Sequence, residues 1–326
     1  MARSLMETLS VLQWIVVFFT MGISCTFLTG YLLFTPLWPL SVLYLTWLII
    51  DWNTPERGGR RSQWVRRWRM WRYMRDYFPV SLVKTAELSP ERNYVLGHHP
   101  HGIMCFGAIC NFCTESTDFS KLFPGITPFV ATLHGIFRLP IYRDYVLSAG
   151  LCSVSKSSLS YLLSKKGTGN AVIIVVGGAA ESMTGKPGEH SLLLKNRKGF
   201  IRLAVAHGAD LVPIYSFGEN DAFDQVIFEP GSWMKWLQLN FQKYMGFAPC
   251  LFKGCGLLFS NTWGLMPFAR PVMTVVGEPI PVTQNPNPSE DEINRYHNKY
   301  QEAITILFNK YKVQYGLSES AELTIY

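Results

Sequence analysis

The amino-terminal part of the chain is one long apolar stretch. From Thr8 to Ile50 no residue carries a charge. A helix that crosses the hydrocarbon core of a bilayer needs about 20 apolar residues, so the stretch has room for two helices, at Val11–Leu33 and Pro39–Ile50. The prolines around position 36 separate them, because proline cannot continue a helix. The pattern predicts a membrane-embedded, transmembrane helical hairpin over residues 1–50, whose second helix is short and either tilts or re-enters.

Two other interpretations of the apolar stretch fit less well. A cleaved signal peptide has a shorter apolar region that ends in a small-residue cleavage site, and this chain has neither. A buried helix pair in a soluble core rarely runs so far without a charge. We therefore expect a multi-pass membrane protein.

The next segment, residues 51–80, combines arginine with aromatic side chains. Up to Arg75 it holds eight Arg against two acidic residues. The positive-inside rule places this side of the hairpin in the cytosol, together with both termini if two helices span. Trp64, Trp68 and Trp71 recur at the spacing of one helical face. This predicts a basic, aromatic interfacial segment at the level of the lipid headgroups, with a solvated helix packed on the main domain as the alternative.

After residue 80, short apolar runs alternate with segments of helical period. Strands that alternate with helices predict an α/β fold with a mixed, largely parallel sheet flanked by helices. The predicted strands are Asn93–Leu96, Ala171–Val176, Leu211–Phe217 and Val272–Val276, and the predicted helices are Ile103–Cys113, Gly199–His207 and one capped by Ser289 and ended by Gly316. No linker interrupts residues 81–326, so we interpret them as one cytosol-facing domain.

Composition narrows the functional classes. Charged residues make up 16% of the chain, below the roughly 25% usual in soluble domains, which argues against disorder and against a coiled coil. The net charge of +7 gathers beside the apolar stretch, which favours a membrane surface over nucleic acid as the partner. The chain has seven Cys, an odd number, and lacks an Asn-x-Ser/Thr site that is free of proline. Both features favour a reducing environment.

The sharpest local feature is a histidine turn at the end of a predicted strand, His99-Pro100-His101-Gly102. Strand ends are where α/β sheets place reactive groups, and Pro100 and Gly102 let the backbone approach a ligand closely. A neutral imidazole there could take a proton from a hydroxyl nucleophile. The alternatives are a histidine turn that only bonds to backbone and, because His-x-His can chelate, a zinc site.

A second strand end carries two glycines and an acid. Gly177 and Gly178 follow the strongest predicted strand and permit backbone N–H groups to face an anion. Glu181 then stands at the same edge of the sheet as the histidine turn. Its alternative role is that of a helix cap or a surface acid.

Basic residues open the predicted helix at 199. Arg197, Lys198, Gly199 and Arg202 lie where a helix N-terminus already favours phosphate, and Arg143 is a further phosphate candidate. Ordinary surface charge is an equally good interpretation of any one of them. Cys105, Cys110 and Cys113 have the spacing of an iron–sulfur site, but they lie in an apolar run where buried thiols are common.

These motifs occur together in a known order. The chain resembles the acyl-CoA:diacylglycerol acyltransferase type 2 family, which also contains monoacylglycerol and wax-alcohol acyltransferases. The resemblance runs from about residue 10 onward. It is carried by Tyr77-Phe78-Pro79, His99-Pro-His-Gly102, Ile173-Ile-Val-Val-Gly-Gly-Ala-Ala-Glu181, Arg197-Lys-Gly-Phe200 and Val212-Pro-Ile-Tyr-Ser-Phe-Gly-Glu219.

The resemblance implies a membrane enzyme of the endoplasmic reticulum and of lipid droplets. It would transfer a fatty acyl group from acyl-CoA to the free hydroxyl of diacylglycerol, making triacylglycerol, without a metal or other cofactor. His99 would be the base, with His101 as the alternative. A looser likeness to the glycerolipid acyltransferase superfamily places Met104 where that superfamily has an Asp, so Glu181 or Glu115 would orient the base.

The acceptor and two rival classes stay open at this point. Residues 177–182 and 241–250 look most like the diacylglycerol-using members, and monoacylglycerol and long-chain alcohols remain alternatives. A metal-dependent membrane hydrolase would contain zinc. A lipid-droplet protein without activity would need only the apolar and basic segments. A homo-oligomer is compatible with each of these.

Overall fold

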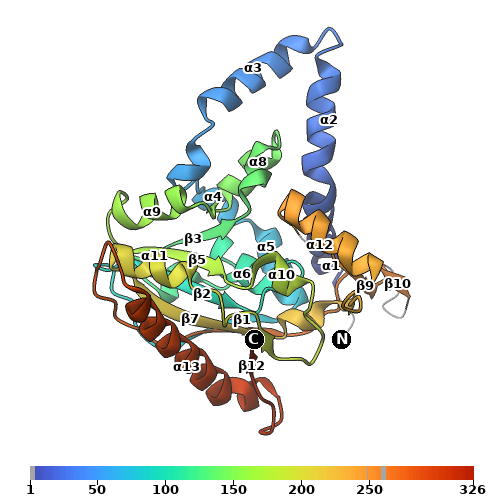
Figure 1. Cartoon of the computed structure of the whole chain (residues 1–326). Coiled ribbons are helices and arrows are strands. Elements are labelled where there is room, and N and C mark those ends of the chain that lie inside the picture. The colour runs from blue at the N-terminus through green and yellow to red at the C-terminus, as the bar shows by residue number, and fades with distance from the viewer. Residues whose placement is uncertain (1–3, 248, 258–261) are drawn as a thin grey trace.

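A mixed sheet forms the centre of the computed structural model, which describes residues 4–247, 249–257 and 262–326 (Figure 1). Residues 1–3 of the predicted hairpin, and Ala248 and residues 258–261 of the predicted domain, lie outside the described residues. In the described part of the chain the sheet has seven strands in the order β1-β11-β7-β2-β5-β3-β4. Their bounds are β1 Val80–Lys84, β2 Tyr94–His99, β3 Thr127–Thr132, β4 Leu151–Ser153, β5 Asn170–Val175, β7 Asp210–Phe217 and β11 Val272–Val276.

Most neighbouring strands of this sheet run parallel. From β7 through β2, β5 and β3 to β4 every pair is parallel, whereas β11 joins β7 antiparallel and β1 joins β11 parallel. The predicted α/β fold with a largely parallel sheet is therefore confirmed. β2 is buried along its whole length, as expected for a central strand that is covered on both faces.

Helices cover both faces of the sheet. α9 (Lys156–Ser164), α11 (Gly199–His207) and α13 (Glu290–Tyr315) pack with Val95 and Val172 on one face, whereas α5 (Arg69–Tyr77), α6 (Phe106–Ala108) and α8 (Tyr142–Ser148) pack with Leu96 and Ile173 on the other. α6 continues as a π-helical segment, Ile109–Cys113. The predicted limits of the last helix are confirmed: Ser289 caps the first turn of α13, and Gly316 ends the helix with a φ of 107°.

The apolar amino terminus forms two long helices that project from the body (Figure 1). α1 (Leu5–Val16), a π-helical segment (Val17–Met21) and α2 (Gly22–Leu32) are continuous, and a tight turn leads to α3 (Trp38–Ile50), so the predicted break is confirmed. α1 packs against α5. In the described part of the chain one helix, Leu5–Leu32, is long and apolar enough to cross a membrane.

The arginine and tryptophan segment differs from its prediction. The helix is interrupted at Arg67 and Trp68, which separate α4 (Gln63–Arg66) from α5. The prediction that Trp64, Trp68 and Trp71 share one helical face is wrong. Trp71 is buried in the core and its indole N–H donates to the carbonyl of Val65 at 2.7 Å, whereas Trp64 remains 73% exposed.

Shorter elements surround the sheet. α12 (Trp233–Met245) exposes several large apolar side chains. The remaining elements are α7 (Phe119–Leu122), α10 (Gly178–Ser182), β6 (Ser191–Leu192), β8 (Asp224–Val226), β9 (Leu251–Cys255), β10 (Trp263–Gly264), β12 (Thr324–Ile325) and 3-10 turns at Thr54–Arg57, His134–Arg138 and Glu219–Ala222.

Candidate active site

The candidate site lies where three parallel strands end. β2, β5 and β7 are neighbours, and in register His98 pairs with Val175 and His99 with Tyr215. Their carboxyl ends therefore meet at one edge of the sheet, where open α/β sheets bind ligands. This topology brings together the histidine turn, the turn before α10 and the turn after β7.

The first two histidines of the segment belong to the sheet and face opposite ways. His98 Nε2 lies 2.9 Å from Ser216 Oγ. His99 Nε2 lies 3.1 Å from the Tyr300 hydroxyl, which itself donates to the carbonyl of Gly97 at 2.9 Å. The Tyr300 proton is thus engaged, so Nε2 of His99 donates to this hydroxyl. Both rings are fully buried, and burial lowers the pKa of each to about 3.

His101 occupies the turn and remains partly exposed. Its Nδ1 lies 2.9 Å from the carbonyl of Gly102. Because a carbonyl only accepts, Nδ1 carries the proton and Nε2 carries the lone pair. The Cys105 thiol is 4.0 Å from Nε2 and donates to the carbonyl of His101 at 3.1 Å. Burial lowers the pKa of His101 from 6.5, so the ring is neutral near pH 7 and can accept a proton.

Glu181 holds the backbone of the histidine turn. Its Oε1 accepts from the His101 N–H at 2.7 Å, and its Oε2 accepts from the Leu193 N–H at 2.7 Å. The carboxyl is buried, which raises its pKa. A Cβ on Gly177 would lie 2.3 Å from this carboxyl, so glycine there is what lets Glu181 fold back. Glu181 contacts the turn's backbone, not an imidazole.

Glu219 is a residue of this edge that the sequence analysis did not select. It follows β7, is buried, and accepts from the N–H groups of Phe106 and Gly107 at 2.7 Å each. A Cβ on Gly102 would lie 2.7 Å from its Cγ. Burial raises the pKa of Glu219 to about 7. The sequence does mark Glu219 as a candidate, because it is a polar residue that directly follows a buried strand and a glycine.

The basic residues before α11 lie beside this edge. Arg197 donates to the carbonyl of Gly177 at 3.2 Å. Lys198 donates to Asn294 on α13 at 2.7 Å, and Arg202 pairs with Glu290. Gly199 begins α11, and a Cβ there would meet nothing within 4 Å; the same is true of Gly178, whose φ is 59°. Arg197 is thus the cation placed nearest the glycine turn.

Two predicted residues lie elsewhere. Arg143 is buried, bonds to Asp51 at 3.0 Å and to the carbonyl of Leu48 at 3.2 Å, and so ties α8 to the end of α3. Its assignment to a substrate phosphate is wrong, because its guanidinium is already engaged in the core. Glu115 pairs with Arg66 at 3.0 Å, so it does not orient His99.

A cavity of about 10 Å³, enough for one water molecule, adjoins Gly102, Ile103 and Glu219. Among the residues that the structure describes, no group of three His, Cys, Asp or Glu side chains is close enough to hold a metal ion. Cys25, Cys105, Cys110, Cys113, Cys152 and Cys250 are free thiols among the described residues.

Comparison with known proteins gives a family. The sequence matches the family model for diacylglycerol acyltransferase over residues 30–326. It is 56% identical to diacylglycerol O-acyltransferase 2 of Homo sapiens over 98% of this chain and 82% of that protein. It is also 56% identical to 2-acylglycerol O-acyltransferase 3 of Homo sapiens, over 98% of this chain and 94% of that protein.

One solved structure, the 1-acyl-sn-glycerophosphate acyltransferase PlsC from Thermotoga maritima, is similar at 13% identity with a TM-score of 0.42. The similarity covers 94% of this chain and 99% of that chain. The family model and the two human relatives lead to one conclusion: the chain is an acyltransferase and belongs to the diacylglycerol acyltransferase family.

Proposed function

We propose that this chain transfers a fatty acyl group from acyl-CoA to the free hydroxyl of diacylglycerol, which makes triacylglycerol. The observation that carries the proposal is the 56% identity to diacylglycerol O-acyltransferase 2 over 98% of the chain. The proton-accepting imidazole at the edge of the sheet supplies the chemistry that this reaction needs.

In the proposed step, Nε2 of His101 takes the proton of the acceptor hydroxyl. The oxygen attacks the thioester carbonyl, the carbon–sulfur bond breaks, and the leaving thiolate of CoA takes the proton from the imidazolium. The sequence analysis named His99 first and His101 as the alternative. The geometry favours His101, because His99 is fully buried and its Nε2 donates to Tyr300.

Glu181 acts in this scheme as a positioning residue that fixes the turn carrying His101. Backbone N–H groups near Gly102 and at Gly177 and Gly178 would stabilise the oxyanion. Arg197 and Lys198, with Arg202 farther along α11, would bind the phosphates of CoA. The scheme uses no metal and no cofactor besides the co-substrate acyl-CoA.

We further propose that α2 and α3 enter the bilayer as a hairpin. The 13 residues of α3 extend about 20 Å against a hydrocarbon core of about 30 Å, so α3 crosses only partly. Both ends of the hairpin return to the same domain, through α1 on α5 and through Asp51 on Arg143. This arrangement supports a catalytic domain that lies on a single side of the membrane, and we propose the cytosolic face of the endoplasmic reticulum, with lipid droplets as a second location.

A second acceptor has equal support from the comparisons. Because 2-acylglycerol O-acyltransferase 3 is also 56% identical, over 94% of its own length, monoacylglycerol is the competing acceptor, and a long-chain alcohol is a more distant one. The overall identity does not separate these acceptors.

The test offers labelled oleoyl-CoA to microsomes that contain the full chain, with diacylglycerol, monoacylglycerol and hexadecanol in parallel. We expect triacylglycerol as the main product, and a loss of about 10²–10⁴-fold for His101→Ala, with the protein still in the membrane. If the main product is diacylglycerol or a wax ester, the acceptor is monoacylglycerol or the long-chain alcohol instead of diacylglycerol. Full activity of His101→Ala would show that His101 is not the base.

A further inference from the structure

A second cavity lies away from the candidate active site. It has a volume of about 350 Å³, is formed where α4 meets α5 and by the loop before α7, and its lining includes Arg67, Trp68, Arg72 and Lys121. This volume is within the roughly 300–1,000 Å³ range of small-molecule sites. His99, His101, Glu181 and Glu219 do not line it. The helix that starts at Phe106, beside Glu219, ends at Cys113 just before Glu115, so one helix separates the two sites.

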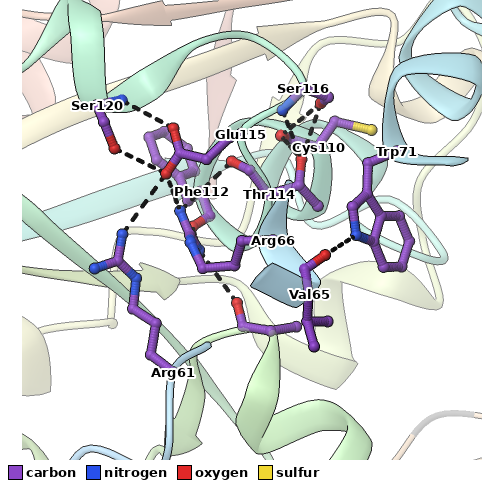
Figure 2. A network of polar contacts seen from close by, with 11 residues as sticks. Arg61, Val65, Arg66, Trp71, Cys110, Phe112, Thr114, Glu115, Ser116 and Ser120 are labelled. Atoms are coloured by element: carbon purple, nitrogen blue, oxygen red, sulfur yellow. Dashed lines mark hydrogen bonds and ion pairs between the residues drawn. The ribbon is translucent and has the colours of Figure 1, made fainter. Parts of the chain in front are cut away.

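An ionic network around Arg66 and Glu115, drawn in Figure 2, forms one wall of this cavity. Arg66 is fully buried and donates to Glu115 at 3.0 Å and to the carbonyls of Phe112 and Ala149 at 2.7 and 3.2 Å. Glu115 also accepts from Ser120, through its N–H at 3.1 Å and its hydroxyl at 2.8 Å. These bonds hold the wall in place before any ligand arrives.

The network leaves positive charge uncompensated. Arg61 lies 3.7 Å from Glu115, the carboxylate that already pairs with Arg66, so two guanidinium groups share one carboxylate. Burial, together with Arg66, lowers the pKa of Arg61 to about 10. The Nε atom of Arg66 is buried without a hydrogen-bond partner among the described residues. An anion in the cavity would relieve this repulsion.

The rim of the cavity adds two further guanidinium groups. Arg67 and Arg72 line it, and neither makes an ion pair with the residues that the structure describes. Lys121 pairs with Asp118 at 3.0 Å. The lining is therefore cationic overall, and arginine is the side chain best shaped to hold phosphate through paired hydrogen bonds.

The surroundings favour a lipid as the source of that phosphate. Trp68 in the lining meets the exposed Trp64 edge to face at 4.9 Å between ring centroids, and tryptophan with arginine is the composition of the headgroup layer. α5 packs on α1, where the apolar helix begins. We propose that this cavity, the arginine pocket, binds the phosphate of an anionic phospholipid headgroup. The proposal rests on the membrane association proposed above.

The test measures binding of dioctanoyl phosphatidate to the purified full-length chain in neutral-lipid nanodiscs at fixed ionic strength. The variant Arg67→Gln/Arg72→Gln removes the unpaired guanidinium groups. Arg69→Gln is the control, since Arg69 is exposed on α5, the helix of Arg72, and does not line the pocket. We expect the double variant to weaken binding about tenfold or more and the control to weaken it less than about twofold.

Two competitors identify the source of the phosphate. Inorganic phosphate and adenosine 3′,5′-bisphosphate, which carries phosphates like those of CoA, should each displace the lipid at least about tenfold less well than phosphatidate itself. Equal displacement by either would overturn the lipid assignment. Equal loss in the Arg69→Gln control, or no loss in the double variant, would overturn the pocket. Binding is read without acyl transfer, so failure of the proposed reaction leaves this result interpretable.

Discussion

His99 and His101 are two residues apart, yet the structure gives them different chemistry. His99 is the last residue of β2 and points into the core, whereas His101 lies beyond the strand with Nε2 carrying the lone pair. A strand projects alternate residues to opposite faces, so the fate of each ring depends on where β2 ends. The pattern of residues alone does not fix that end to within one position.

The first prediction concerns the pH dependence of acyl transfer. Burial lowers the pKa of His101 from 6.5, so the neutral, proton-accepting ring persists below pH 6.5. We expect kcat to stay level as the pH falls through 6.5 and to drop only at more acidic values. A rate that halves at or above pH 6.5 in detergent micelles would contradict this, and the residual rate of His101→Ala should lack the drop.

The second prediction tests the reassignment of Arg143. Removing Arg143 leaves the carbonyls of Leu48 and Asp51 without the guanidinium that donates to them, which costs about 1–3 kcal/mol for each buried group left unsatisfied, although Asp51 keeps its ion pair with Arg60 at 3.1 Å. Arg143→Gln should therefore lower the melting temperature, while the KM for acyl-CoA of the surviving enzyme stays unchanged. Arg57→Gln, at an exposed position, should change neither. A raised KM at unchanged melting temperature would restore Arg143 to the substrate site.

The third prediction concerns Glu219. Its pKa is 4.5 in an unfolded chain and about 7 in the fold, so the folded state binds the proton more tightly. The stability that this group contributes is fully present below pH 4.5 and is lost as the pH rises to about 7. In melting curves between pH 4.5 and 8, the melting temperature of the wild-type chain should therefore fall as the pH rises, and Glu219→Gln should remove this slope.

In Glu219→Gln the amide NH2, which can only donate, faces one of the two backbone N–H donors, and this costs about 1–3 kcal/mol. Glu319→Gln, at an exposed glutamate, is the control and should keep the slope. An unchanged slope in Glu219→Gln would show that other groups cause it.

Site residues at strand ends could be predicted from the sequence, whereas residues that contact the site from distant elements could not. The rule that polar groups after buried strands gather at one edge found the histidine turn and Glu181, and it also applies to Glu219. Nothing marked Tyr300, since a tyrosine in the apolar stripe of a helix looks like any other core residue. The assignment of Arg143 to a substrate phosphate was wrong because the sequence does not show that its partner is Asp51, which lies far away along the chain.

At the scale of elements, the strands with β-branched runs and the helices with clear caps matched their predictions. Val272–Val276 and Gly199–His207 were found with the predicted limits. The arginine and tryptophan segment did not match, because Trp68 adopts an extended ψ of 139° as the cap of α5. Periodicity assumes an unbroken helix, so a single extended residue shifts every later side chain to another face.

The fourth prediction concerns α12. Trp233, Trp236 and Tyr244 on this helix are 72%, 66% and 79% exposed. We expect this face to rest in the headgroup layer. A cysteine at Trp236 should resist a membrane-impermeant maleimide in microsomes and react once detergent is added.

The control for this experiment is Glu290→Cys, at the exposed start of α13, which should react in both conditions. The labelling of the wild-type chain, which has cysteines of its own, is subtracted from the labelling of each variant. Full labelling at position 236 before detergent would place α12 in water.

At the scale of the whole molecule, apolar surface gathers on one side. α2, α3 and α12 expose their large apolar side chains, whereas α13 presents acidic residues in its first turn. The candidate site lies at the edge of the sheet where β2, β5 and β7 end. The arrangement would let a lipid acceptor arrive from the bilayer and acyl-CoA from the cytosol.

The contact of Tyr300 with the carbonyl of Gly97 and with His99 bears on the order of biosynthesis. Ribosomes make the histidine turn before α13, so the turn lacks its support from behind until α13 has been made. We expect chains stalled before residue 290 to insert into microsomes and to transfer no acyl group from labelled oleoyl-CoA, whereas released chains do. The newborn protein would thus be anchored in its membrane well before it is able to act on the lipids there.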